Sequence, residues 1–296
     1  MMWRAWFFSA ALAAASGIAA FAAAADPIAD LKAAAALQSK SQHAAALAAF
    51  RPLAKTLPKL GDYVAWFTAT SEFDLENYAS VAKALEPLWA QSPPSPLVAR
   101  SAMLGAQAYQ KSGNAQDALD LLRKYYAALP QPAGDLAMAK AFAANGDAVS
   151  AAVYAQRVYY GYPASSEAAE ADAVATTLRT QLNDAYPPAM GNVRLGRALK
   201  LLDAGQTRTA RRELVALATQ LGGPERDTAQ VKIGVADYVA KDTRAARKYL
   251  TELTVESPQA DAERIYYLLL CARRGDDRAG AANALEQLTR LHPDSS

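Results

Sequence analysis

The sequence predicts an all-α fold, an array of paired helices, and three observations support this prediction. Alanine makes up about a quarter of the chain, and alanine loses no side-chain entropy when a helix forms. Alternating runs of β-branched residues, which are typical of strands, are almost absent from the sequence. Prolines also recur at nearly constant intervals, at Pro58, Pro94, Pro130 and Pro163.

A second series continues this spacing, at Gly222, Pro258 and Pro293. A period of roughly 34 residues is typical of helix-turn-helix repeats that stack into a superhelix. The clearest copy, residues 106–130, resembles the tetratricopeptide pattern. In that pattern a small residue is followed three positions later by an aromatic residue, then by a glycine at the turn, an alanine and a closing proline. The next copy begins one period later, at Ala139.

Each position of the pattern has a physical reason. Gly113 and Gly146 would end the first helix of a pair, where a left-handed backbone costs glycine little. Ala118 and Ala151 would lie where the paired helices cross, because a larger side chain there would push the helices apart. The prolines end the second helix, since proline has no N–H to donate. Five other stretches repeat the second-helix half, so we expect about seven helix pairs; these stretches contain Ala46, Ala82, Ala210, Ala246 and Ala281.

The repeat breaks its period once, since the interval from Pro163 to Gly222 holds a repeat plus the length of an extra helix. We interpret the break as an inserted helix or a seam between two sub-arrays. The expected organisation is therefore a signal peptide in residues 1–25, a first sub-array in 26–165, the inserted helix in 166–190 and a second sub-array in 191–296.

The N-terminal segment, residues 1–25, has the composition of a secretory signal peptide. Arg4 precedes an apolar stretch over residues 5–20, and residues 23–25 are small, as a signal peptidase requires. The alternative is a membrane anchor that is never cleaved; we expect cleavage, a periplasmic protein and no later membrane span. The single cysteine, Cys271, leaves no internal disulfide to stabilise a secreted chain, so the fold depends on core packing.

The residues offer little catalytic chemistry. The net charge of +2 gives no reason to expect a nucleic-acid partner. The sequence has two histidines and no motif for a zinc site, a catalytic thiol, a serine triad or a phosphate loop, so we expect no metal and no cofactor. The acidic run Glu72, Asp74 and Glu76 can be interpreted as an acid/base pair, but we favour the solvated side of a turn.

Tyrosines and arginines are the candidate binding residues. Three tyrosine pairs occur at residues 125–126, 159–160 and 266–267, and adjacent helical residues cannot share a face, so one ring of each pair points out of the hairpin core. That ring could stack on a sugar or a peptide, but we favour packing against the adjacent repeat. Arginines make the C-terminal third basic and could line a groove for an anionic polymer, although we favour a solvated helix face. The candidates are Tyr126, Tyr160, Tyr267, Arg211 and Arg212.

Two stretches carry a resemblance to a known family. Residues 156–168 contain an Arg-x-Tyr-Tyr-x-x-Pro run, and residues 197–205 contain an Arg-Ala-x-x-Leu-x-x-x-Gly run after the break in the repeat. Together they resemble the superhelical part of soluble lytic murein transglycosylases. Members of that family cleave peptidoglycan glycan strands in cell-wall turnover with a lysozyme-like domain. The Glu-Ser and Gly-Leu-Met-Gln signature of that domain is missing here. The comparable dipeptide, Glu256-Ser257, precedes Pro258 at a repeat boundary and no Gly-Leu-Met-Gln run follows it, so no catalytic residue is assigned.

Two functions therefore remain open from the sequence. The chain could wrap and position peptidoglycan for a catalytic domain that it does not contain, in which case an apolar stripe should be exposed on the final helix, over Ala281, Leu285, Leu288 and Leu291. Alternatively, it is a stand-alone periplasmic tetratricopeptide scaffold whose concave face binds a protein partner.

Overall fold

The computed structural model describes residues 26–294, and within this range the chain is helical and contains no strand. Fifteen α-helices of this range pack in consecutive order, which confirms the predicted all-α, tetratricopeptide-like array. None of the helices in the described range is long and apolar enough to cross a membrane. The expected signal peptide, residues 1–25, lies outside the described residues.

The helices form four hairpins, then one unpaired helix, then three hairpins. The first four hairpins are α1 (Pro27–Ser39) with α2 (His43–Thr56), α3 (Gly61–Asp74) with α4 (Tyr78–Trp89), α5 (Val98–Lys111) with α6 (Ala115–Tyr125), and α7 (Ala133–Ala144) with α8 (Ala148–Gly161). After α9 (Ala168–Leu182) come α10 (Gly191–Asp203) with α11 (Thr207–Ala218), α12 (Gly223–Val239) with α13 (Thr243–Glu252), and α14 (Pro258–Arg274) with α15 (Arg278–Leu291).

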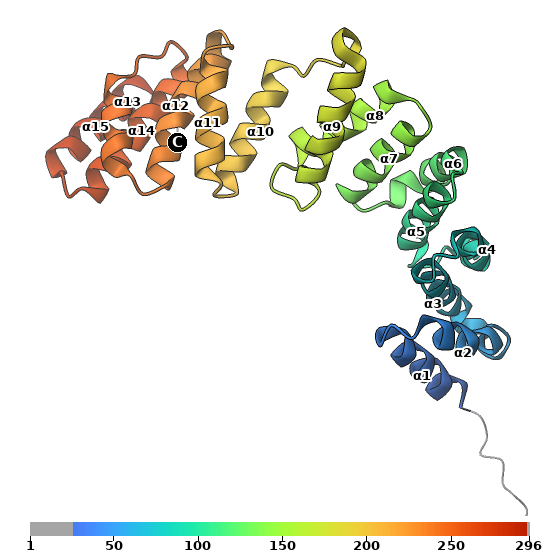
Figure 1. Cartoon of the computed structure of the whole chain (residues 1–296). Coiled ribbons are helices and arrows are strands. Elements are labelled where there is room, and N and C mark those ends of the chain that lie inside the picture. The colour runs from blue at the N-terminus through green and yellow to red at the C-terminus, as the bar shows by residue number, and fades with distance from the viewer. Residues whose placement is uncertain (1–25, 295–296) are drawn as a thin grey trace, which may run out of the picture.

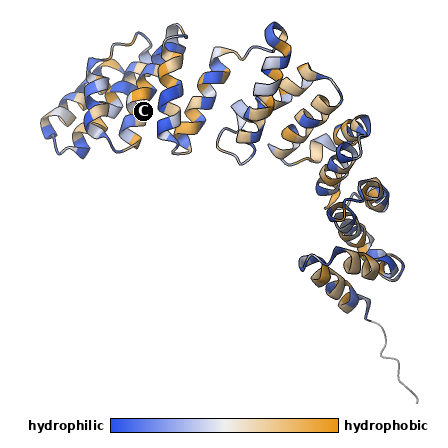
Figure 2. Ribbon diagram, in the orientation of Figure 1, coloured by the Kyte–Doolittle hydropathy of each residue, from blue (hydrophilic) through white to orange (hydrophobic). Residues whose placement is uncertain are grey.

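The array is curved. Figure 1 shows the N-terminal hairpins turning away from the direction of α10–α15, with α3 and α5 on the inner side of the arc and α4 and α6 on the outer side. Hydropathy changes along this arc: Figure 2 shows more hydrophilic residues in α10–α15 than in α1–α9. The second half of the molecule is therefore the more polar one, as its arginine content predicts.

The turn inside every hairpin uses the same backbone device. A residue with positive φ stands two positions before each second helix, and in three turns it is a glycine, as expected for Gly113 and Gly146 (φ 82° in both). The other four turns force a larger residue into this left-handed conformation, which L-residues with a Cβ adopt at a cost. All seven positions are Ser41, Glu76, Gly113, Gly146, Gly205, Lys241 and Asp276. Seven copies in phase are thus present in the structure.

The predicted helix crossings are buried. Ala118, Ala151, Ala210 and Ala246 are completely inaccessible to solvent, and each lies in the first turn of a second helix. In the second hairpin the corresponding position belongs to Val81 and not to Ala82, because α4 begins at Tyr78. Small residues here let the backbones approach, so these positions fix the geometry of each pair.

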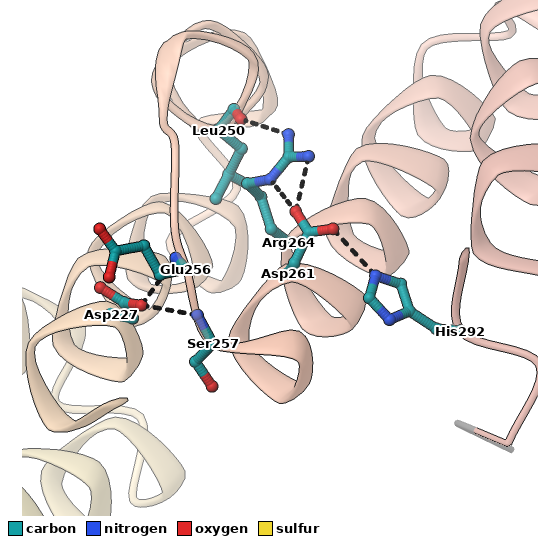
Figure 3. A network of polar contacts seen from close by, with 7 residues as sticks. All are labelled: Asp227, Leu250, Glu256, Ser257, Asp261, Arg264 and His292. Carbon is teal, nitrogen blue, oxygen red and sulfur yellow. Dashed lines mark hydrogen bonds and ion pairs between the residues drawn. The ribbon is translucent and has the colours of Figure 1, made fainter. Parts of the chain in front are cut away.

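Aspartates near the start of first helices bind the segment that follows the second helix of the same hairpin. Asp227, at the start of α12, accepts hydrogen bonds of 2.8 Å from the backbone N–H groups of Glu256 and Ser257, in the turn that leads to α14 (Figure 3). Burial raises the pKa of Asp227, but these hydrogen bonds outweigh burial and hold the pKa below its ordinary value. Asp261 meets Nε2 of His292 at 2.9 Å one repeat later (Figure 3). His292 is therefore a partly buried partner of this carboxylate.

The core is interrupted once along the array. Clusters of buried apolar residues run from α1 to α9 and again from α10 to α14, but within the described residues none combines members from both sides of residues 183–190. Helix α10 packs against α8 through polar contacts instead. We call this α8–α10 interface the seam. Whether it divides two sub-arrays, as the sequence suggested, stays a prediction.

The final helix exposes part of its apolar stripe. Leu285 and Leu291 of α15 are 55% and 53% exposed, while Ala281 and Leu288 are partly covered.

Candidate functional site

Polar contacts across the seam centre on Arg197 of α10. Its Nη1 donates to the backbone carbonyl of Tyr159, near the C-terminus of α8, and its guanidinium carbon lies 3.6 Å from the centre of the Tyr159 ring. Lys200, one turn further on, donates to the carbonyl of Gly161 at 2.9 Å. The last carbonyls of a helix lack partners within it and carry partial negative charge, so two cations satisfy this end of α8 well.

Two cavities flank these contacts and share the side chain of Tyr160. The first, of about 560 Å³, lies between α7, α8 and α10; we call it the valine cavity. The second, of about 370 Å³, lies between α8, α10 and α11; we call it the arginine cavity. We refer to both together as the seam groove. The valine cavity includes Asp135, Val153, Gln156, Arg157, Tyr162, Asn192, Val193 and Lys200, and the arginine cavity includes Tyr159, Arg194, Arg197, Arg212, Glu213 and Leu217.

The structure brings together two of the five residues selected from the sequence. Tyr160 and Arg212, from α8 and α11, line the arginine cavity from opposite sides of the seam. Tyr160 is half-buried, and burial raises the pKa of its phenol, so this side chain stays neutral and can donate a hydrogen bond. Arg212 is exposed, and among the described residues it has no ion-pair partner.

Tyr126 belongs to a buried polar network at the edge of the valine cavity. Its hydroxyl donates to Oδ1 of Asp135, whose side chain is only 3% exposed. Burial, together with this hydrogen bond, raises the pKa of Tyr126 to about 12. Nε of Arg157 reaches the other carboxylate oxygen at 3.1 Å, and its guanidinium lies over the Tyr154 ring at 5.1 Å. The Tyr126 ring is thus a positioning group for Asp135 and Arg157, and the pair 125–126 has no exposed member.

Arg211 and Tyr267 lie away from the seam groove. Arg211 pairs with Asp237 of α12 at 2.7 Å, on the other side of α11 from the arginine cavity residues. Tyr267 packs against the buried core of α10–α14, where its ring meets that of Tyr238 edge-on at 5.4 Å. The exposed member of this pair is Tyr266, which is 45% exposed, so the choice of Tyr267 as the outward ring is corrected. Both tyrosines lie within the seventeen-residue helix α14, and the sequence alone does not show which of the two faces the next repeat.

The acidic candidates have structural partners. Glu72 accepts a hydrogen bond from the Asn77 side chain at 2.9 Å, and Asp74 lies 3.3 Å from Nδ1 of His43. Glu256 contributes its backbone N–H to Asp227, while its side chain is exposed (Figure 3). Among residues 26–294 no group of three or more His, Cys, Asp or Glu side chains could hold a metal ion.

Most residues of the groove, among them Asp135 and Arg194, were missed by the sequence analysis. Asp135 could have been found by its phase, because buried aspartates recur near the start of first helices, at Asp62, Asp135 and Asp227. Arg194 has no such signal. It enters the arginine cavity only because α10 is placed against α8 and not against α9.

Comparisons with known proteins add little to this description. No family model matches the sequence, and no curated protein matches it. Among solved structures the chain is similar to one described as Naa15/Naa10 bound to HypK-THB, at 15% identity and a TM-score of 0.34. The match covers 91% of this chain and 54% of that one, so this chain spans about half of its length. No comparison connects the chain to lytic transglycosylases.

Proposed function

We propose that the protein is a periplasmic tetratricopeptide-like scaffold that binds an extended segment of a partner protein in the seam groove. The periplasmic part of the proposal is supported by Arg4, the apolar stretch and the small residues of the N-terminal segment. The binding part is supported by the composition of the groove. Export into the periplasm of a bacterial host, followed by intact-mass measurement, tests the first part, because cleavage removes residues 1–25.

The observation that carries the binding proposal is an exposed apolar lining inside a cavity. Val153, Tyr162 and Val193 line the valine cavity and are 43%, 41% and 37% exposed. Water-exposed apolar side chains gathered in a concave site mark a binding surface more strongly than single ones scattered over a helix.

Polar groups accompany this lining. Asn192 is exposed beside Val193 and can both donate to and accept from a peptide backbone. Lys200 adds positive charge at the edge of the same cavity, whereas the charge of Arg157 is balanced by Asp135. Apolar pockets that alternate with hydrogen-bonding groups suit an extended polypeptide, whose side chains and amide groups alternate in the same way.

Site-specific photo-crosslinking in the periplasm of a bacterial host tests this proposal. A photoreactive phenylalanine analogue replaces Val153, inside the valine cavity, or Val215, which is equally exposed at 43% on α11 but does not line either cavity of the groove. We expect discrete protein adducts from position 153 and none of the same mass from position 215. Equal adducts at both positions, or none at 153, would contradict the proposal.

A second candidate function is wrapping of peptidoglycan glycan strands as the superhelical part of a lytic transglycosylase-like protein. One observation favours it: Arg197 stacks on Tyr159, so the two stretches that carry the family resemblance contact each other across the seam. Incubation of the full chain with intact sacculi tests it. Pelleting that is lost in a Tyr160→Ala variant supports glycan binding, and no pelleting favours the protein-binding scaffold.

A further inference from the structure

We propose that the arginine cavity binds the carboxylate of an acidic side chain in the partner segment, through Arg212 and Arg194. This inference rests on the proposed partner-binding function and specifies the chemistry of the segment. It predicts a partner sequence in which acidic residues lie next to apolar ones, since the arginine and valine cavities adjoin at Tyr160.

The first argument comes from the ion pairs that join one hairpin to the next hairpin, or to the unpaired α9, elsewhere in the array. At four places a cation on one repeat reaches a carboxylate on the next. These pairs are Lys140–Glu170, Arg211–Asp237, Lys232–Glu263 and Arg247–Asp277. In the described structure, the same kind of pair is missing across the seam. There Arg197 and Lys200 of α10 donate to backbone carbonyls of α8, and Arg212 of α11 meets no carboxylate of α8.

The second argument is the charge left over in the arginine cavity. Its one carboxylate, Glu213, is already bound by Nε of Arg197 at 3.2 Å. Arg194 donates to the neutral amide oxygen of Gln220 at 2.6 Å, and Arg212 has no ion-pair partner among the described residues. Two positive charges in the cavity therefore lack a counter-charge.

Charged groups on the surrounding helices do not supply that counter-charge. Asp172 of α9 lies close enough to raise the pKa of Tyr159, but it does not line the cavity. Arg179, also on α9, acts to lower the pKa of Tyr159 and of Tyr160. Its guanidinium carbon lies 5.0 Å from the centre of the Tyr186 ring. The electrostatic balance of the region therefore stays positive and favours an anion.

The shape of the cavity favours a side-chain carboxylate. A guanidinium presents two parallel N–H groups that match the two oxygens of a carboxylate. The neutral hydroxyl of Tyr160 is a further donor at the border of the two cavities, and the exposed Ala216 offers an apolar contact for the methylene groups of an acidic side chain. A volume of about 370 Å³ accommodates one or two such side chains.

Fluorescence anisotropy with defined peptides tests the inference on the full chain. The probe is a fluorescein-labelled eight-residue peptide that contains Glu-Glu-Leu-Val, and its isosteric control contains Gln-Gln-Leu-Val. We expect the glutamate peptide to bind at least about tenfold more tightly than the glutamine peptide, with a preference that weakens at high salt. An Arg212→Gln variant should lose this preference.

The matched control is Arg244→Gln, which removes the same charge from an arginine of α13 outside the seam groove. It should keep the preference, and circular dichroism should show that both variants remain folded. A charge-reversed Arg212→Glu variant that prefers a Lys-Lys-Leu-Val peptide would support direct contact.

Three outcomes would overturn the inference. They are equal binding of the glutamate and glutamine peptides, loss of the preference in Arg244→Gln, and displacement of the glutamate peptide by inorganic phosphate at equal concentration. In each case crosslinking from position 153 would still report separately on the proposed partner-binding function.

Discussion

Replacement of Arg197 by methionine should weaken the seam more than any other single change on the surface of α10. Methionine keeps the aliphatic part of the side chain, so the packing of α10 is largely preserved. The variant removes the hydrogen bond to the Tyr159 carbonyl, the contact with the Tyr159 ring and the pair with Glu213. The Arg197 side chain is only 12% exposed, so solvent cannot easily replace these contacts.

The expected loss of stability is about 2–4 kcal/mol, from two contributions. A hydrogen bond from a charged donor contributes about 1.5–3 kcal/mol, and a partly desolvated cation–π contact about 0.5–2 kcal/mol. The contributions share one side chain and do not add fully. Glu213, 23% exposed, is left without its cation, but water can partly solvate it.

Urea unfolding followed by circular dichroism measures this loss, with Arg244→Met as the control for an arginine outside the seam. We expect Arg244→Met to change the free energy of unfolding by less than about 0.5 kcal/mol. We also expect a broader transition for Arg197→Met, because hairpins on the two sides of the seam would unfold less cooperatively. A loss below about 1 kcal/mol for Arg197→Met, or a loss equal to that of the control, would refute the assignment of Arg197 as the main link.

Three further predictions concern the fold. Ala118→Leu should reduce the free energy of unfolding by about 1–3 kcal/mol through overpacking at a fully buried crossing, whereas Leu at the exposed Ala79 should have little effect. Lys241→Gly should raise the melting temperature, because relief of the left-handed backbone, about 1–2 kcal/mol, exceeds the added unfolded-state entropy of about 0.4–1 kcal/mol; a lower melting temperature would count against strain at this turn. Asp227→Asn should destabilise the protein by about 1–3 kcal/mol at neutral pH. Because the folded pKa of Asp227 lies below the ordinary value of about 4, the stability it contributes is present above that value and is lost as the pH falls through the folded pKa. Unfolding curves of Asp227→Asn and the unmodified chain should therefore converge in acid, and a constant gap at all pH values would contradict the role of this carboxylate.

Most of the repeat architecture could be predicted from the sequence because its determinants are local. A short turn selects a left-handed position, and an alanine in the next helical turn permits close crossing, so Gly113 and Ala118 mark a hairpin wherever it occurs in the chain. Where Lys241 or Asp276 takes the left-handed position, the alanine and proline positions still preserve the phase.

The candidate site depends on contacts between residues that are distant in sequence, and for this reason only part of it could be predicted. Tyr160 and Arg212 were selected for their residue types, but their proximity depends on how α10 and α11 pack against α8 across the seam. Arg211, one residue earlier, faces Asp237 instead, since adjacent positions on a helix point about 100° apart.

Composition and period by themselves determined that this chain forms seven helical hairpins, because each hairpin is specified within a single repeat. Tertiary structure alone decided which tyrosine is covered and which arginine lacks a carboxylate. These properties depend on the rotation of one repeat against the next, and at the seam that rotation is set by Arg197 and Lys200 on the end of α8. No local sequence pattern encodes such a contact, since its partners are backbone carbonyls that every residue possesses.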